Sequence, residues 1–208
     1  MSFNKIGFNK ILGAFPTLER DERLDLVQQL EQGAQANIDF IMMMVLSTSL
    51  ASLGLLADST AVVIGAMLVA PLMGPLVAAG CSLVQGNLSL FRRSLAVILI
   101  GIGIGFAASL IFGALNPGFE PTLEIEARGK ADLLDLGIAF FSGMTAAYAT
   151  GRSHVMTTIA GVAIAAALVP PLAVVGLALT HGRPLISFNA AILLTTNLVA
   201  IILGAAIV

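Results

Sequence analysis

The chain has 208 residues, of which 58% are hydrophobic and only 11% are charged, and its mean hydropathy is +0.99. Soluble domains carry about 25% charged residues, and a soluble fold of this size could not bury so much apolar surface. The net charge of −2 excludes a nucleic-acid binder, which needs a basic patch. One Cys and two His exclude a disulfide scaffold and a zinc cluster. The composition therefore predicts an all-α integral membrane protein.

Residues 1–37 form a charged arm in which we expect two amphipathic helices. The first, over 3–15, has a basic side and an aromatic side typical of a membrane-surface helix, although a loosely ordered tail is the alternative. The second, over 16–37, carries an apolar stripe and is expected to pack on the membrane domain or on a neighbouring subunit, unless it is simply solvated. The stripe consists of Leu24, Val27, Leu30 and Ala34.

Six apolar stretches approach the length of about 20 residues that a membrane-spanning helix needs. They cover about 39–57, 60–85, 94–115, 134–150, 156–181 and 186–208. Nearly all the charged residues after the arm fall in the breaks between these stretches. We therefore expect a transmembrane domain of six helices over 38–208.

The orientation of these spans follows from the Lys and Arg residues in the connecting segments, which favour the cytoplasmic side. With six spans, the arm, the 86–93 loop, the 151–155 loop and the C-terminus share one side and carry seven of these residues. The opposite side carries three. We expect a multi-pass protein of the cell membrane, with both termini cytoplasmic and the acidic 116–133 loop outside.

An internal repeat relates the second and fifth spans. Residues 65–80 align without a gap with 161–176, and this offset of 96 pairs Pro75 with Pro171. Each copy then holds three spans, with repeat one at about 38–115 and repeat two at about 134–208. An odd number of spans makes the second copy enter the membrane from the opposite side, which is the 3+3 inverted topology of many transporters. Duplication is also a simple way to build a helical bundle.

Prolines near the middle of the second and fifth spans predict that both helices are broken there. An interior proline removes a backbone hydrogen bond and costs ~3 kcal/mol or more. The freed backbone groups must be buried in protein or line a wet cavity, so both spans should be central and lie side by side. Such half-helices can bind an ion or a polar solute, whereas a dry kink without a site is the alternative.

The predicted substrate site lies where these two broken helices meet, together with the few polar side chains that could serve it. Hydroxyls on the first and fourth spans could instead serve helix packing alone. Asn197 is the strongest polar side chain, because an unpaired amide in hydrocarbon is unfavourable. The full set is Pro71, Met73, Gly74, Pro75, Val169, Pro170, Pro171, Ser49, Ser52, Thr145, Tyr148 and Asn197.

The segments Gly65-Ala-Met-Leu-Val-Ala-Pro-Leu-Met-Gly-Pro75 and 161–176, with its Pro170-Pro171, resemble a prokaryotic membrane family known as domain of unknown function 389. The resemblance covers about 35–208. It implies a polytopic membrane domain in a prokaryotic membrane, and it brings no activity, substrate or site residue.

Two functions compete on these observations. The inverted repeat and the broken helices favour a transporter or channel for a small solute or ion, with a midplane site between them. The small size and the smooth apolar spans fit a structural or accessory membrane protein without transport activity. No nucleophile and base share a span, so we expect no enzyme, and no cofactor or metal either. The bilayer and further copies of the chain, in a closed homo-oligomer, are the expected partners.

The topology can be tested by cysteine labelling of intact cells. We expect Glu124→Cys to react with a membrane-impermeant maleimide and Arg92→Cys to be protected, because the first lies in the predicted external loop. The parent chain, which retains Cys81, is the control. The opposite labelling pattern reverses the orientation.

Overall fold

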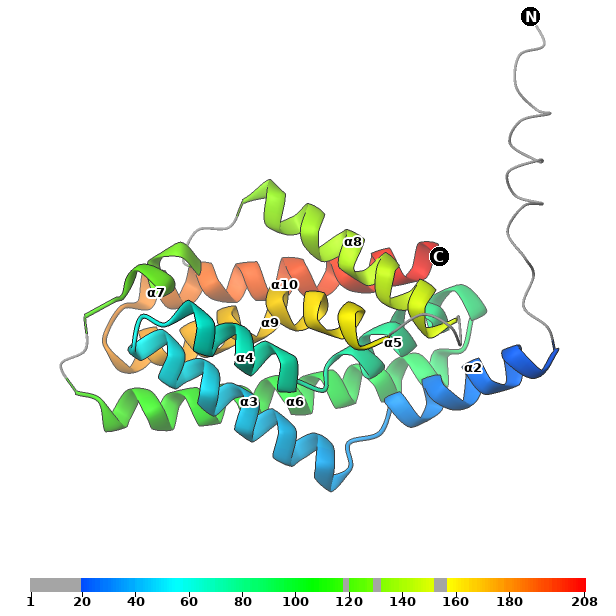
Figure 1. Ribbon diagram of the computed structural model, residues 1–208, viewed down its shortest axis with the longest axis horizontal. Helices are drawn as coiled ribbons and strands as arrows, with labels where there is room; N and C mark the ends of the chain where they lie inside the picture. The colour runs from blue at the N-terminus through cyan, green and yellow to red at the C-terminus, as the bar shows by residue number, and fades with distance from the viewer. Residues whose placement is uncertain (1–19, 118–119, 129–131, 152–156) are drawn as a thin grey trace, which may run out of the picture.

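The computed structural model describes residues 20–117, 120–128, 132–151 and 157–208, and at 20–22 and 157–163 it describes the backbone alone. All regular structure in these residues is helical (Figure 1). The helices are α2 (Arg20–Gly33), α3 (Ile38–Leu56), α4 (Thr60–Val69), α5 (Met73–Gln85), α6 (Leu88–Leu115), α7 (Leu123–Arg128), α8 (Leu133–Thr150), α9 (Thr157–Thr180) and α10 (Pro184–Ile207).

The longest helices lie along one another as a bundle whose length is set by α6, α9 and α10 (Figure 1). Four helices, α3, α6, α8 and α10, are long and apolar enough to cross a membrane, and α4 with α5 makes a fifth if the pair crosses as one span. The side chains of α9 are described only from Ile164, which leaves an apolar stretch of 164–180. The chain is therefore a helical membrane-spanning protein, while six spans and the inverted repeat stay predictions.

The break expected in the second span is confirmed. Helices α4 and α5 are separated by three residues and bend by 58°. Ala70 is extended, with φ −70° and ψ 124°, because the ring of Pro71 disfavours helical backbone in the residue before it. Pro75 then lies in the first turn of α5, where a missing N–H removes no helical bond. Pro71 therefore ends the first half-helix, and Pro75 is compatible with the start of the second.

The break expected in the fifth span was wrong, because α9 remains helical through Pro170 and Pro171. The offset of 96 explains the difference: the residue that matches Pro71 is Ala167, a strong helix former. Pro170 and Pro171 lie inside the continuous α9, where each leaves the carbonyl four residues before it without an amide donor.

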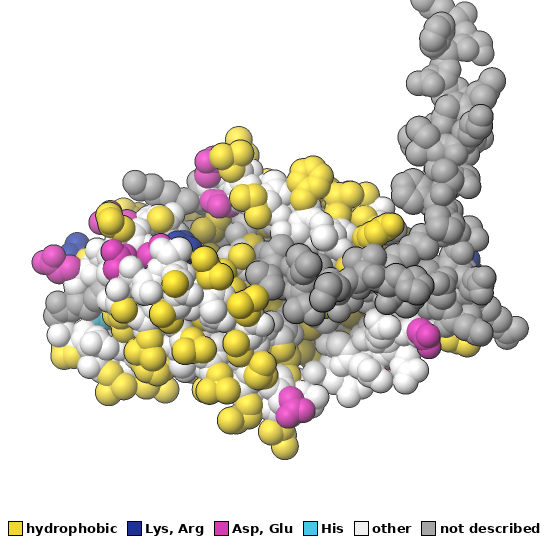
Figure 2. Space-filling model, in the orientation of Figure 1, with side chains coloured by type: hydrophobic (Ala, Val, Ile, Leu, Met, Phe, Trp, Pro, Cys, Tyr) yellow, Lys and Arg dark blue, Asp and Glu magenta, His cyan; other side chains and the backbone are white. Residues whose placement is uncertain are grey.

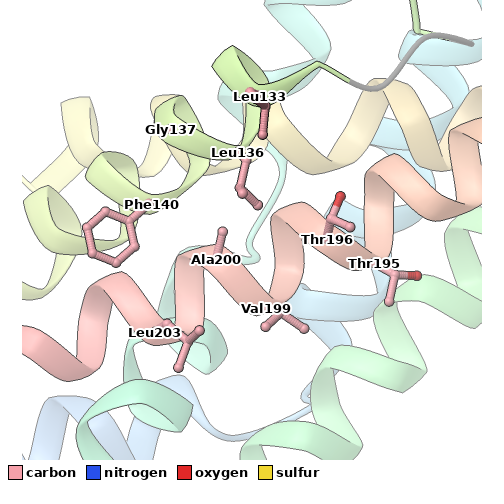
Figure 3. A pocket seen from close by; sticks show the side chains of 9 residues that line it. All are labelled: Leu133, Leu136, Gly137, Phe140, Thr195, Thr196, Val199, Ala200 and Leu203. Carbon is pink, nitrogen blue, oxygen red and sulfur yellow. The ribbon is translucent and has the colours of Figure 1, made fainter.

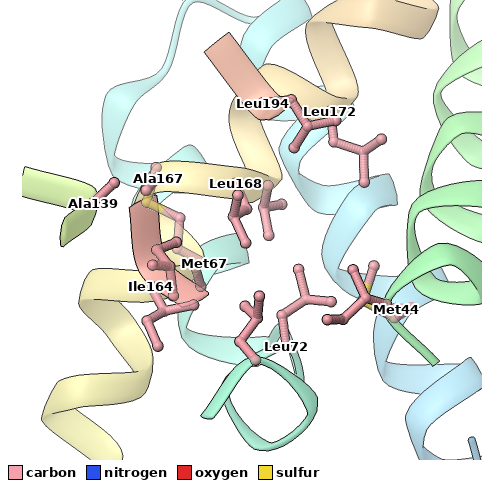
Figure 4. Packing of buried hydrophobic residues seen from close by; sticks show 14 of the residues in the cluster. Met44, Met67, Leu72, Ala139, Ile164, Ala167, Leu168, Leu172 and Leu194 are labelled. Atoms are coloured by element: carbon pink, nitrogen blue, oxygen red, sulfur yellow. The ribbon is translucent and has the colours of Figure 1, made fainter. Parts of the chain in front are cut away.

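The centre of the bundle is a cluster of buried apolar side chains around the α4–α5 break (Figure 4). Met67 and Leu72 flank the break, and Leu168 and Leu172 of α9 pack into the same cluster. Met44 of α3 closes it on another side. Within the break Leu72 is thus buried inside the bundle, whereas Ala70 and Pro71 are partly exposed.

Helices α8 and α10 approach each other so closely that their backbones touch. A Cβ on Gly143 of α8 would overlap the carbonyl of Ile201, and a Cβ on Gly204 of α10 would overlap the carbonyl of Phe140. Glycine permits this because it has no side chain, as is common where membrane helices cross. The two helices run in the same direction along this contact (Figure 1).

The apolar stripe expected in the second arm segment lies on α2, and its C-terminal half packs on the membrane domain. Leu30 and Ala34 are buried, whereas Leu24 and Val27 are 62% and 44% exposed. Helix α2 packs against α5. The surface helix expected at 3–15 lies outside the described residues.

The acidic loop between α6 and α8 contains α7, which sequence periodicity did not predict. The Thr122 hydroxyl donates to the carbonyl of Leu55 at 2.8 Å, and the Glu124 amide donates to Asp58 at 3.1 Å. The Glu124 carboxylate pairs with Arg128 at 2.7 Å. These contacts fasten α7 to the α3–α4 turn, and Figure 2 shows carboxylates gathered at that end of the bundle.

The α8–α10 contact predicts a strong difference between two glycines. Gly143→Ala should lower the free energy of unfolding by about 1–3 kcal/mol, because the new methyl group overlaps a backbone carbonyl. Gly103→Ala is the control: nothing lies within 4 Å of its Cβ position, so it should be neutral or stabilise the α6 helix by about 0.5–1 kcal/mol. Thermal unfolding in mild detergent measures both. Equal stabilities for the two variants would contradict the close approach.

Candidate functional site

The α4–α5 break leaves helix ends inside the membrane domain. A side chain donates a hydrogen bond at the end of α4, whereas no side chain caps the start of α5. At the end of α4, the Ser47 hydroxyl of α3 donates to the carbonyl of Ala66 at 2.8 Å. This carbonyl would otherwise receive the amide of Ala70, which has left the helix. At the start of α5, Leu72 is the N-cap residue and no side chain caps the first amides. The α5 terminus therefore presents backbone donors, with the positive end of the helix dipole behind them.

A side chain from α10 replaces a hydrogen-bond donor that a proline removes from α9. A proline at position 171 cannot donate to the carbonyl of Ala167, four residues before it. The Asn197 Nδ2 donates to this same carbonyl at 2.9 Å. The amide of Asn197 thus replaces the backbone donor that Pro171 lacks.

The other end of the Asn197 amide is buried and unpaired. Its side chain is only 3% exposed, and its Oδ1 has no hydrogen-bond partner among the described residues. An unsatisfied acceptor in a membrane interior is costly, so this oxygen favours any donor or cation that reaches it. Asn197 lies near the middle of α10, which runs from Pro184 to Ile207.

Three of the four hydroxyl residues predicted to surround the site donate to carbonyls of their own helices. Ser52 is fully buried and donates to the carbonyl of Thr48, and Ser49 donates to Val45. Thr145 on α8 is exposed and donates to Phe141. Such back-bonding satisfies the hydroxyl locally.

Tyr148 is 45% exposed on α8. The polar residues expected from α8 are therefore turned toward the outside of the bundle, and only Ser52 among the four lies in the interior. The proline segments are better placed, because Leu72 beside Pro71 and Leu168 beside Val169 pack into one buried cluster. Their role in binding stays a prediction.

Two contributors to the break lie outside the predicted set of site residues. Ser47 could have been found from the helical spacing of Phe40, Met44 and Ala51, which share its buried face of α3. The contact of Gly33 with Gly74 joins the end of α2 to the first turn of α5, and no periodicity signals it.

A separate groove lies between α8 and α10, on the outer side of the bundle (Figure 3). It has a volume of about 620 Å³. Its walls are apolar apart from Thr195 and Thr196, whose hydroxyls donate to carbonyls of their own helix. The groove offers no free polar group and does not contain the predicted site. No group of three His, Cys, Asp or Glu side chains in the described ranges could hold a metal ion.

Comparison with known proteins gives a family and no activity. Residues 67–203 match the family described as domain of unknown function 389. An uncharacterized protein of Methanocaldococcus jannaschii is 30% identical over 203 residues, which cover 93% of this chain and 63% of that protein. The chain thus spans less than two thirds of the length of this relative. No solved structure matches the chain.

The pairing of Asn197 with the proline-freed carbonyl can be tested by a double-mutant cycle. Asn197→Leu should lower the free energy of unfolding by about 1–2 kcal/mol, because it leaves the Ala167 carbonyl without a donor. Adding Pro171→Ala should recover most of that loss, since Ala at 171 restores an N–H four residues after Ala167. Thr196→Val, at an exposed neighbour, is the control and should change stability little. Additive effects of the two substitutions in detergent unfolding would refute the pairing.

Proposed function

The chain belongs to the family named domain of unknown function 389, and from that premise we propose that it carries a small solute or ion across the membrane at the α4–α5 break. The observation that carries the proposal is the interruption of an apolar span, bent by 58°, beside the buried apolar cluster at the centre of the bundle. Irregular backbone at membrane depth is tolerated where it is buried in protein or lines a solute pathway. Broken helices of this kind form the substrate sites of many secondary transporters.

The chemistry available at the break suits a solute bound through neutral groups. The uncapped α5 terminus supplies amide donors, and Asn197 of α10, which also donates to α9, supplies an unpaired acceptor. No Asp, Glu, Lys or Arg lies in the centre of the described spans, so proton coupling through a buried carboxylate is not part of the proposal. Sodium, a neutral polar solute or passive flow fits these groups best.

The arrangement of the helices supports an inverted repeat. Helices α3 and α8, the first of each proposed copy, lie on opposite sides of the bundle and run toward opposite ends (Figure 1). In this conformation Met67 and Leu72 fill the space beside the break (Figure 4). The proposal therefore takes this structure as a closed state, in which the apolar side chains must move before a solute passes.

The same dry packing favours a second candidate, a structural or accessory membrane protein without transport activity. In that case the kink of α4–α5 only shapes the bundle, and Ser47 and Asn197 serve backbone satisfaction alone. A homo-oligomer in the cell membrane, with both termini cytoplasmic, fits either candidate.

Flux through proteoliposomes distinguishes the two candidates. We expect the purified protein to speed ²²Na⁺ uptake or glycerol permeation over that of empty vesicles. Pro71→Ala should reduce this flux about tenfold or more, a change of ~1.4 kcal/mol in the barrier, because it restores helical backbone at the break. Pro184→Ala is the matched control, since Pro184 occupies the first turn of α10 and interrupts nothing. Vesicles with wild-type protein that pass neither probe faster than empty vesicles would favour the structural candidate.

A further inference from the structure

We propose that α2 is a built-in plug of the α4–α5 break, whose C-terminal end occupies the α5 terminus until it is displaced. The proposal rests on the function proposed for the break and adds its regulation. It assigns a role to a helix that lies outside the part of the chain matched by the family, residues 67–203.

The contact between the plug and the break is made by two glycines. A Cβ on Gly33, the last residue of α2, would lie 3.0 Å from the Cα of Gly74, in the first turn of α5. A Cβ on Gly74 would lie 2.9 Å from the Cα of Gly33. Real Cβ atoms do not approach backbone so closely, so the two main chains are in direct van der Waals contact. The α2 helix therefore ends against the half-helix that starts the second part of the broken span.

The charges at this contact favour a C-terminal end of α2 that occupies the position of a bound solute. The last carbonyls of a helix carry partial negative charge, and the first amides carry partial positive charge. The C-terminal end of α2 thus meets the N-terminal end of α5, which has no side-chain cap. The Gly33 carbonyl oxygen lies 3.3 Å from the Cβ position of Gly74. An acceptor group of a solute would need this same place beside the α5 amides.

The attachment of α2 permits its removal without unpacking the bundle. Leu30 and Ala34 are its buried anchors, and they belong to the end nearest the break. The rest of the helix is largely open, with Leu24 62% exposed and the charged Arg23 and Asp25 on the surface. Residues 34–37 then connect α2 to α3 without regular helix. Swinging α2 away would expose the α5 terminus and leave the contacts among the spans in place.

Flux tests whether α2 closes the pathway. Gly33→Val should displace α2 from Gly74, because any side chain at this position overlaps main chain. We expect this variant to pass ²²Na⁺ and glycerol at least about tenfold faster than the wild-type protein. Gly65→Val is the control and should leave the flux unchanged, since nothing lies within 4 Å of its Cβ position. Unchanged flux in Gly33→Val, with a wild-type protein that transports, would overturn the plug while leaving transport intact.

A second measurement decides the proposal even if no flux is found. Gly33→Val should force α2 away from Gly74, because the new side chain overlaps main chain there. In the Cys81→Ala background, Met73→Cys should then react several-fold faster with maleimide than it does with Gly33 in place. Gly65→Val is the matched control, since nothing lies within 4 Å of the Gly65 Cβ position. Equal reaction rates with Gly33 and with Val at 33 would overturn the plug. Faster labelling without flux in any variant would sustain the α2 cover and reject the transport function itself.

Discussion

A backbone carbonyl that loses its helical donor inside a membrane cannot turn to water, and this constraint governs the centre of the bundle. Prolines and the break expose such carbonyls in two helices, and in each helix a polar side chain from a neighbouring helix donates to one of them. Ser47 reaches Ala66 at the end of α4, and Asn197 reaches Ala167 in α9. The neighbours α3 and α10 are thereby fixed in rotation, because a turn of either helix would withdraw the donor.

The two side-chain donors, Ser47 and Asn197, act on helices with different structures. In α9 the side-chain donor replaces one of the two bonds that the prolines remove, and the helix continues. In α4 the donor serves a chain that has already turned away, and the span becomes two half-helices. One bundle therefore contains a continuous central helix beside a broken one. The broken helix provides termini within the membrane, whereas the continuous helix provides a stiff wall against which they pack.

Much of the architecture follows from hydropathy, since α8 begins one residue before the predicted span and α10 two residues before it. The break at Pro71 was also predictable, because the residue before a proline avoids helical backbone. The course of α9 was not, since it depends on Asn197, thirty positions away in sequence, meeting one carbonyl.

The same limit applies at the site. Helical spacing could have identified Ser47 as an interior residue, but it could not place Tyr148, which lies on the outer part of α8. The contact between Gly33 and Gly74 involves no side chain, so composition and periodicity cannot predict it. Interactions between distant main chains are settled by the packing of whole helices, and only a three-dimensional structure reveals them.

The glycine contact between α8 and α10 has a mechanical consequence for the bundle. Main chains that touch at Gly143 and Gly204 cannot slide past one another by a fraction of a turn without collision between carbonyls. The pair therefore behaves as one rigid frame. Helix α5 belongs to this frame as well, because a Cβ on its Gly80 would lie 2.7 Å from the carbonyl oxygen of Ile202. Helix α4 is joined to α5 only through a three-residue break, so α4 can change its angle while the frame stays still. Any working motion of this protein is then divided unequally, with a fixed half that keeps its shape and a jointed half that moves against it.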